Sequence, residues 1–258
     1  MTTDDKQLLE GRRAPMPFTR LLRVQLRAWR GQRGMVWLTG LAVLVGVVAA
    51  MFGVSSLDDN PTAPLVEERF GAASVGFTLL WQAVGVLAGA APFRSGWAGM
   101  VLSVAPRRLR WLAASYVSMI GWAAGTTLVF GTLGWAAVTA FLAGGSDGSG
   151  AGLGVLGALP AVTVKVLIDV TVGFALGSAA RSVAIPLMAG YVATSFVPLL
   201  DGPTKGLSRL IDLDSATEAA AGVHTAPHGL GPVIAALVLW AVVPAAIAAV
   251  RLQRSDVR

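Results

Sequence analysis

The chain has 258 residues, of which 55% are hydrophobic and only 13% are charged. A soluble domain usually has about a quarter of its residues charged, so this composition excludes an ordinary water-soluble fold. The mean hydropathy of +0.68 agrees with a chain that places most of its surface in lipid. There is no cysteine, which excludes disulfides, thiol catalysis and thiolate metal sites.

Six apolar stretches are long enough, or nearly so, to cross a bilayer. A helix rises about 1.5 Å per residue, so about 20 apolar residues span a hydrocarbon core about 30 Å thick. We therefore expect an all-α integral membrane protein with one six-helix domain from residue 35 to residue 250. The expected spans are Met35–Val54, Ala73–Phe93, Trp111–Ala143, Gly152–Ala180, Val183–Leu200 and Leu230–Val250. The third and fourth exceed the required length, so we expect them to tilt or to extend past the bilayer.

Lysine and arginine are distributed unequally between the segments that join these stretches. Apart from Lys165, which lies inside a stretch, only Arg69, Lys205 and Arg209 fall on the side opposite to the two termini. Positively charged flanking residues are retained in the cytoplasm, so we expect both termini on that side, with residues 251–258 as a cytoplasmic tail. We expect the protein to lie in a bacterial inner (plasma) membrane. These flanking residues account for the sequence pI near 10.7, and we expect no nucleic-acid partner.

The cytoplasmic arm, residues 1–34, contains a segment with helical periodicity from Phe18 to Arg33. At about 100° per residue, arginines gather on one face and apolar residues on the opposite face. The two faces consist of Arg20, Arg23, Arg27, Arg30 and Arg33, and of Phe18, Leu21, Leu22, Leu26, Ala28 and Trp29. This pattern is typical of a helix lying in the lipid headgroup region. The alternative is an ordinary arginine-rich flank whose periodicity is accidental.

The segment between the second and third stretches contains an arginine-x-glycine element, an apolar run and a Pro-Arg-Arg element. The motif residues are Arg94, Ser95, Gly96, Trp97, Pro106, Arg107 and Arg108. The apolar run from Trp97 to Val104 predicts a short helix along the membrane surface, which Pro106 ends. We expect the arginines to hold the next span at the lipid headgroups, beside apolar side chains that would suit a cytoplasmic protein.

In these motifs the chain resembles the membrane subunits of ABC-2 type transporters. Such subunits have six spans, an interfacial helix before the first, and an Arg-x-Gly element followed by a short helix, a Pro-Arg-Arg element and small residues. The matching residues are Arg94-Ser95-Gly96, Pro106-Arg107-Arg108, Ala113-Ala114 and the terminal Gln253-Arg254-Ser255-Asp256-Val257. The sequence departs from the family pattern at Trp97, where threonine is common, and at Ser115, where lysine is common.

The resemblance implies the permease subunit of an exporter, which forms the substrate pathway as a homodimer or heterodimer. The segment from Arg94 to Arg108 would receive the motion of a separate cytoplasmic ABC ATPase, and the alternative is a plain loop between helices. No Gly-x-x-x-x-Gly-Lys-Ser/Thr motif occurs, so we expect this chain to be no enzyme and to hold no cofactor. ATP and Mg would bind to the partner. We also expect no metal site, because Pro227 disfavours the helix that would bring His224 and His228 together.

Lys165 and Asp169 form a charged pair near the middle of the fourth stretch. Each costs about 2.5–3.5 kcal/mol at a helix centre, but residues four apart share a helix face and can neutralise each other. The pair is either a structural element buried against a neighbouring helix or a polar lining of the transport path. Replacing Asp169 alone is expected to harm assembly. A charge-swapped pair is expected to restore folding and, if the pair lines the path, to impair export.

Two further patterns concern helix packing and the last external segment. Gly85 and Gly89 form a Gly-x-x-x-Gly motif, which we interpret as a close helix contact. Ser215 and Glu218 predict a capping box within the segment Asp201–His228, and therefore short amphipathic helices at the outer membrane face. In the resembled family such helices gate the external end of the pathway, whereas the alternative is an inert surface loop.

Two other functions remain open from the sequence. One is a secondary transporter driven by protons or ions, with Lys165 and Asp169 as the coupling groups, although no inverted repeat is visible. The other is a membrane accessory protein without transport of its own. Dependence of transport on ATP distinguishes the exporter from the first alternative, and absence of transport indicates the second.

Overall fold

The computed structural model describes residues 17–55, 62–75, 78–104, 108–142, 148–195, 210–222 and 229–254. Within these ranges every regular element is a helix and no strand occurs, which confirms the all-α prediction for this part of the chain. The elements are α2 (Phe18–Gly31), α3 (Arg33–Ser55), α4 (Ala63–Val75), α5 (Thr78–Arg94), α6 (Trp97–Val104), α7 (Arg108–Leu142), α8 (Gly148–Ala180), α9 (Ala184–Ser195), α11 (Leu213–Ala221), α12 (Leu230–Leu237), the π-helical turn η2 (Val238–Val242) and α13 (Val243–Arg254).

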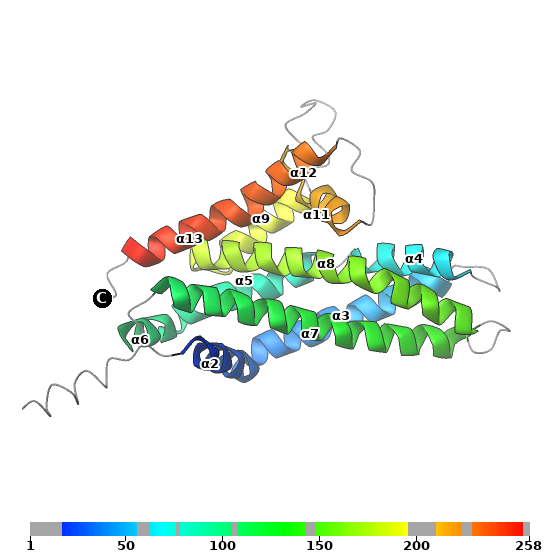
Figure 1. Cartoon of the computed structure of the whole chain (residues 1–258), viewed down its shortest axis with the longest axis horizontal. Coiled ribbons are helices and arrows are strands. Elements are labelled where there is room, and N and C mark those ends of the chain that lie inside the picture. The colour runs from blue at the N-terminus through cyan, green and yellow to red at the C-terminus, as the bar shows by residue number, and fades with distance from the viewer. Residues whose placement is uncertain are drawn as a thin grey trace, which may run out of the picture.

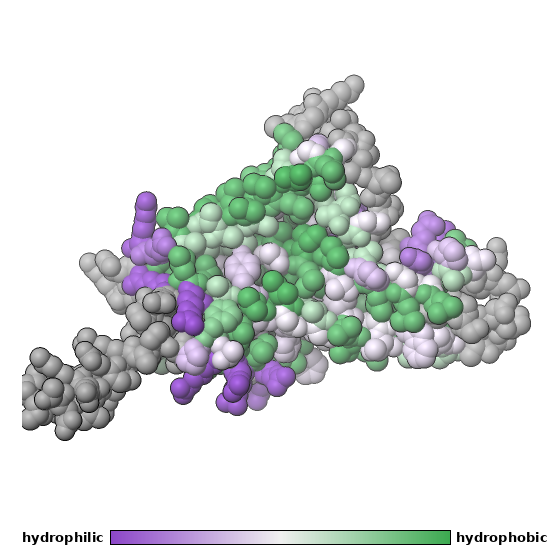
Figure 2. Space-filling model, in the orientation of Figure 1, coloured by the Kyte–Doolittle hydropathy of each residue, from purple (hydrophilic) through white to green (hydrophobic). Residues whose placement is uncertain are grey.

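Four helices are long and apolar enough to cross a membrane. They cover Arg33–Ser55, Arg108–Phe141, Leu153–Ala180 and Leu230–Arg254, and they match the first, third, fourth and sixth predicted stretches. In Figure 1, α3, α7 and α8 run along the long axis of the molecule, while α12 and α13 form an inclined helix on the upper side of this bundle. Figure 2 shows a hydrophobic band over the middle of the molecule and hydrophilic side chains gathered towards its two ends.

The second and fifth predicted stretches are helical but shorter than a span in the described residues. In place of one helix over Ala73–Phe93, the structure has α4 and α5, and α5 has 17 residues. Such a helix is about 26 Å long, slightly less than a bilayer core. Of the predicted stretch Val183–Leu200, α9 covers 12 residues, and residues 196–200 lie outside the described ranges. The structure thus shows four candidate spans, and six spans remain a prediction.

Helix α4 was not predicted, because its charged residues interrupt the apolar pattern that identifies a span. Val66 and Phe70, four residues apart on one face, are completely buried. This face packs against α3 and α8, and the Phe70 ring lies 5.5 Å from the ring of Phe130. Burial of one apolar stripe is sufficient to hold a short helix whose other face is charged. In Figure 1, α4 covers the end of α8 that lies farthest from α13.

Helix α8 is the centre of the bundle, in contact with α4, α5, α7, α9, α11 and α13. Its contact with α5 depends on two facing Gly-x-x-x-Gly motifs, Gly85 and Gly89 on α5 and Gly173 and Gly177 on α8. A Cβ atom added at Gly85 would lie 2.8 Å from the backbone nitrogen of Phe174, closer than real Cβ contacts. The predicted packing role of Gly85 and Gly89 is confirmed, and the glycines of α8 are the partner motif that the sequence analysis missed.

The last span-length helix contains the π-helical turn η2 just before Pro244. A proline has no N–H, and its ring clashes with the carbonyl four residues earlier, so a wider turn relieves the helix at this point. Trp240 lies in this turn, and its indole nitrogen donates a hydrogen bond to the carbonyl of Ile211 at 2.9 Å. This bond fixes the segment that leads into α11.

Candidate functional site

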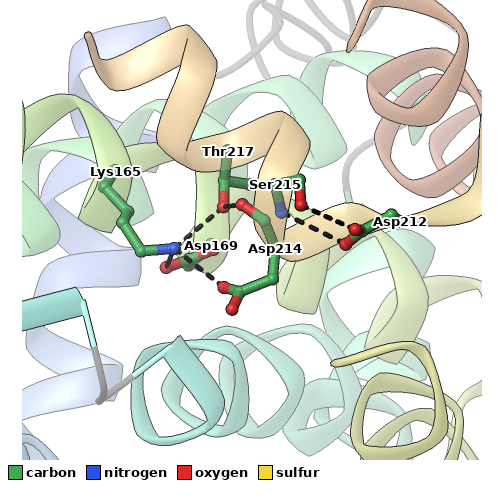
Figure 3. A network of polar contacts seen from close by, with 6 residues as sticks. All are labelled: Lys165, Asp169, Asp212, Asp214, Ser215 and Thr217. Atoms are coloured by element: carbon green, nitrogen blue, oxygen red, sulfur yellow. Dashed lines mark hydrogen bonds and ion pairs between the residues drawn. The ribbon is translucent and has the colours of Figure 1, made fainter. Parts of the chain in front are cut away.

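The buried Lys165 of α8 lies where α11 packs onto that helix (Figure 3). Its side chain is only 4% exposed. The ammonium nitrogen donates to the hydroxyl of Thr217 at 2.8 Å and to a carboxylate oxygen of Asp214 at 3.2 Å. It also forms an ion pair with Asp169 at 3.6 Å, a distance too long for a hydrogen bond. The predicted pair is therefore present, but the shorter contacts of Lys165 go to a different helix.

Helix α11 presents Asp214 and Thr217 to Lys165 because of the way the helix begins. The carboxylate of Asp212 accepts hydrogen bonds from the backbone nitrogen of Ser215 at 3.1 Å and from its hydroxyl at 2.6 Å. Asp212 is thus the N-cap, and residues three apart in the first turn share a face. The predicted capping box that starts at Ser215 is wrong, since aspartate caps a helix as well as serine does and α11 begins three residues earlier than expected.

The cluster contains one lysine and two carboxylates. Asp169 is 1% exposed, and within the described residues neither of its oxygens accepts a hydrogen bond. Asp214 is 36% exposed and can keep contact with water. Because an uncompensated buried charge is far more costly than an exposed one, Asp169 depends on Lys165 for its charge compensation, whereas Asp214 does not.

The cluster lies near the middle of α8, which runs from Gly148 to Ala180. Arg181 follows the last residue of α8, and Lys165 precedes it by about 24 Å along the helix axis at about 1.5 Å per residue. The predicted position of Lys165 near the middle of its span is confirmed, but its partners Asp214 and Thr217 were not predicted. The acidic residues in the first turn of α11 are visible in the sequence, but no sequence pattern predicts which buried charge they contact.

Helix α2 confirms the predicted amphipathic helix. Its exposed face contains Arg20, Arg23, Arg27 and Arg30. Its opposite face packs against protein rather than lipid, and Leu21, Gln25 and Trp29 are buried there. Gln25 donates a hydrogen bond to the hydroxyl of Ser115 on α7 at 2.7 Å. In Figure 1, α2 is seen almost end-on beside α3 and α7, so its axis crosses those helices, as expected for a helix parallel to a membrane surface.

The predicted short helix after the arginine-x-glycine element is also present, with the bounds that the sequence indicated. Arg94 ends α5, and α6 covers Trp97–Val104. Between them Gly96 adopts a φ of 70°, a value that favours glycine, and the hydroxyl of Ser95 donates to a carbonyl of α5 at 3.0 Å. Helix α6 exposes Met100, which is 71% accessible, at the same end of the molecule as α2 (Figure 1).

The Pro-Arg-Arg element is described only in part. Pro106 and Arg107 lie outside the described residues, as do His224 and His228. Arg108 begins α7, and its guanidinium donates to the carbonyls of Leu252 at 3.0 Å and Gln253 at 3.4 Å. The last carbonyls of a helix lack intrahelical partners, so an arginine there stabilises the helix end. Arg108 thus ties the start of α7 to the end of α13, a contact that the sequence analysis did not predict.

No protein-family model matches this chain, and no curated protein matches it either. The resemblance to ABC-2 type permeases therefore depends on the short sequence motifs alone.

Proposed function

We propose that this chain is the transmembrane permease subunit of an ABC-2 type exporter in a bacterial plasma membrane. Two copies, or one copy with a paralogue, would form the substrate pathway and bind a separate cytoplasmic ATPase that holds ATP and Mg. Both termini would lie in the cytoplasm, and α5 and α9 would complete six spans. The observation that supports this proposal most is α6, a short helix inserted between α5 and α7 at the end of the molecule where α2 also lies.

Helix α6 is suited to receive motion from a soluble partner. Met100 offers an exposed apolar contact, and the nearby Arg94 offers an exposed charge. A partner that moves α6 would act on α5 through the short Gly96 turn. Because α5 and α8 touch backbone to backbone at their glycines, we expect these two helices to move as one body. Motion at α6 would then reach Lys165 and, through it, α11.

In this proposal α11 covers the outer end of the pathway and Lys165 holds it in the closed arrangement. The support is geometric: salt bridges join Lys165 to Asp169 within α8 and to Asp214 on α11. The lysine therefore links a spanning helix to a helix of the external segment. A shift of α8 along its axis would change the contact with Asp214 and leave the contact with Asp169, which moves with the same helix.

The test is purification of the tagged full chain from its native membranes in mild detergent, with mass spectrometry of the proteins that accompany it. We expect a P-loop ATPase with the wild-type chain, and its loss with Arg94→Ala or Met100→Asp. The matched control is Arg69→Ala, which removes an exposed arginine from α4 at the opposite end. Absence of an ATPase under several mild conditions, or its retention in both α6-region variants, would contradict the proposal.

A second candidate function, a secondary transporter driven by protons or ions, is favoured by one observation. Asp169 is a buried carboxylate whose oxygens accept no hydrogen bond within the described residues. Binding of a proton or a cation would therefore lower the free-energy cost of burying this group. Vesicles that contain the purified chain and no ATP would then show a pH-gradient-driven flux, lost in Asp169→Asn. An ATPase-dependent flux would instead favour the exporter, and no flux under either condition would indicate an accessory protein.

A further inference from the structure

A pocket between the end of α8 and the end of α13 is lined by three arginines. Its volume is 380 Å³, and among the described residues its lining consists of Arg181, Val250, Arg251 and Arg254. We propose that this pocket binds the phosphate of an anionic phospholipid, whose acyl chain lies along the exposed face of α13. This proposal does not depend on the exporter function.

Two of the arginines are each held by a hydrogen bond to a backbone carbonyl. Arg181 donates to the carbonyl of Arg251 at 3.3 Å, and Arg251 donates to the carbonyl of Ala179 at 2.6 Å. The guanidinium of Arg181 also lies over the ring of Phe93, 5.0 Å from its centroid. These reciprocal contacts hold the guanidinium groups of Arg181 and Arg251 at the lining of the pocket, where an anion would interact favourably with both.

The backbone of Arg181 indicates that its side chain is needed at this position. Its φ is 55°, in the left-handed region, where the chain just past a helix end usually has glycine. A non-glycine residue there is unfavourable by about 1–2 kcal/mol. A chain with 31 glycines nevertheless has arginine at this corner. Strain that persists at one residue is typical of a binding site.

Compensation of the helix ends accounts for part of the cluster. Arg181 donates to a carbonyl in the last turn of α13, and Arg251 donates to one in the last turn of α8. Neither bond involves the side chain of Arg254, which also lines the pocket. Three guanidinium groups that line one pocket therefore provide the positive charge and the hydrogen-bond donors of a phosphate site.

An apolar stripe on α13 leads directly to this pocket. Val243, Ile247 and Val250 are between 42% and 45% exposed, and with Arg254 they follow one another at intervals of three or four residues. They therefore share one helix face. The distance from Val243 to Arg254 is about 16 Å at about 1.5 Å per residue, so the stripe and its basic end together have about the depth of one leaflet. A basic head position at the end of an apolar stripe of this length fits a phospholipid better than a free anion.

The experiment measures thermal unfolding of the full chain in neutral detergent as phosphatidylglycerol is added, with phosphatidylcholine as the uncharged comparison. We expect phosphatidylglycerol to raise the unfolding temperature and phosphatidylcholine to have little effect. Arg254→Gln and Arg251→Gln should each weaken the apparent affinity about fivefold, since an arginine near an anionic lipid contributes about 1 kcal/mol. The control Arg30→Gln removes an exposed arginine of α2 and should leave the affinity unchanged.

Two further arms distinguish a lipid from a free anion. Ile247→Ser alters the apolar stripe without touching the arginines, so it should weaken binding of phosphatidylglycerol but not of inorganic phosphate. Stabilisation by inorganic phosphate equal to that by the lipid would overturn the lipid assignment. Equal losses in Arg254→Gln and Arg30→Gln would show general charge attraction and overturn the site. Native mass spectrometry of retained lipid gives the same comparison for any variant whose unfolding is not cooperative.

Discussion

Lys165 is the residue on which the polar contacts of the bundle interior converge. The sequence predicts its pairing with Asp169 because the two residues are four apart on one helix. The structure adds Asp214 and Thr217, which lie closer to the ammonium group than Asp169 does. The lysine therefore has partners on two helices, and its loss has a different consequence from the loss of either acid.

We predict that Lys165→Met destabilises the protein by about 3–5 kcal/mol, because it leaves Asp169 buried without a positive partner. Asp214→Asn should cost about 1 kcal/mol, the scale of one exposed ion pair. The double variant Lys165→Met with Asp169→Asn should recover most of the stability that the single variant loses. The measurement is reversible unfolding in mixed micelles. Equal destabilisation by Lys165→Met and Asp214→Asn would contradict this assignment of partners.

The same geometry changes the expectation for a charge-swapped pair. A carboxylate at position 165 would lie beside Asp214, which is within 3.2 Å of the present ammonium group. Lys165→Asp with Asp169→Lys is therefore expected to remain unstable, with improvement only when Asp214→Lys is added. Folding yields of the double and triple variants, compared by gel filtration in detergent, check this. A well-folded double variant would mean that α11 is not held by this contact.

At the scale of helices, α2 and the α5–α8 pair show two different means of attachment. Helix α2 packs on the bundle through large buried side chains. Helix α5 packs on α8 through two glycines on each helix, which let the two backbones come into contact. Both modes are visible in the sequence as a pattern on one helix. The partner surface of each helix is visible only in the structure.

Trp29 and Trp37 provide a matched comparison for the attachment of α2. Trp29 is 1% exposed within the bundle, whereas Trp37 on α3 is 77% exposed. We predict that Trp29→Ala lowers the free energy of unfolding by about 3–5 kcal/mol, as for other buried aromatic residues. Trp37→Ala should have little effect on unfolding in detergent. A similar loss for both would show that α2 does not pack on α7 in the way described.

The glycine contact between α5 and α8 allows a second comparison. A methyl group at Gly85 would meet the backbone of α8, whereas one at Gly121 on α7 has no atom within 4 Å. Gly85→Ala is expected to destabilise by about 1–3 kcal/mol through overpacking. Gly121→Ala is expected to be neutral or slightly stabilising, since alanine favours helix more than glycine does. Thermal unfolding of both variants in the same detergent gives the answer, and a neutral Gly85→Ala would refute the contact.

Because the chain has no cysteine, single introduced cysteines can report the orientation of the whole molecule in the membrane. Single cysteines introduced by Arg30→Cys on α2 and Glu68→Cys on α4 lie on exposed positions at opposite ends of the bundle. With the termini in the cytoplasm, a membrane-impermeant maleimide should label the second variant in intact cells, and the first only after permeabilisation. The opposite labelling pattern would invert the topology, and labelling of both in intact cells would contradict a fold that spans the membrane.

The sequence by itself determined the features that depend on local pattern. The apolar lengths of four candidate spans, the two faces of α2 and the bounds of α6 all follow from spacing within one segment. Helix α4 could not be predicted in this way, because its stability comes from burial of Val66 and Phe70 against other helices. Composition likewise does not decide whether helices close to the minimum length of a span, such as α5 and α9, cross the membrane.

Only the tertiary structure decided which residues meet across long distances in the chain. The contacts of Lys165 with Thr217, of Arg108 with the end of α13 and of Arg181 with Arg251 each join segments that no local periodicity relates. The physical reason is that an apolar helix surface has no strong preference for one partner, and shape and a few polar atoms select it. The sequence therefore set which helices form, and packing around α8 set where their polar residues come together.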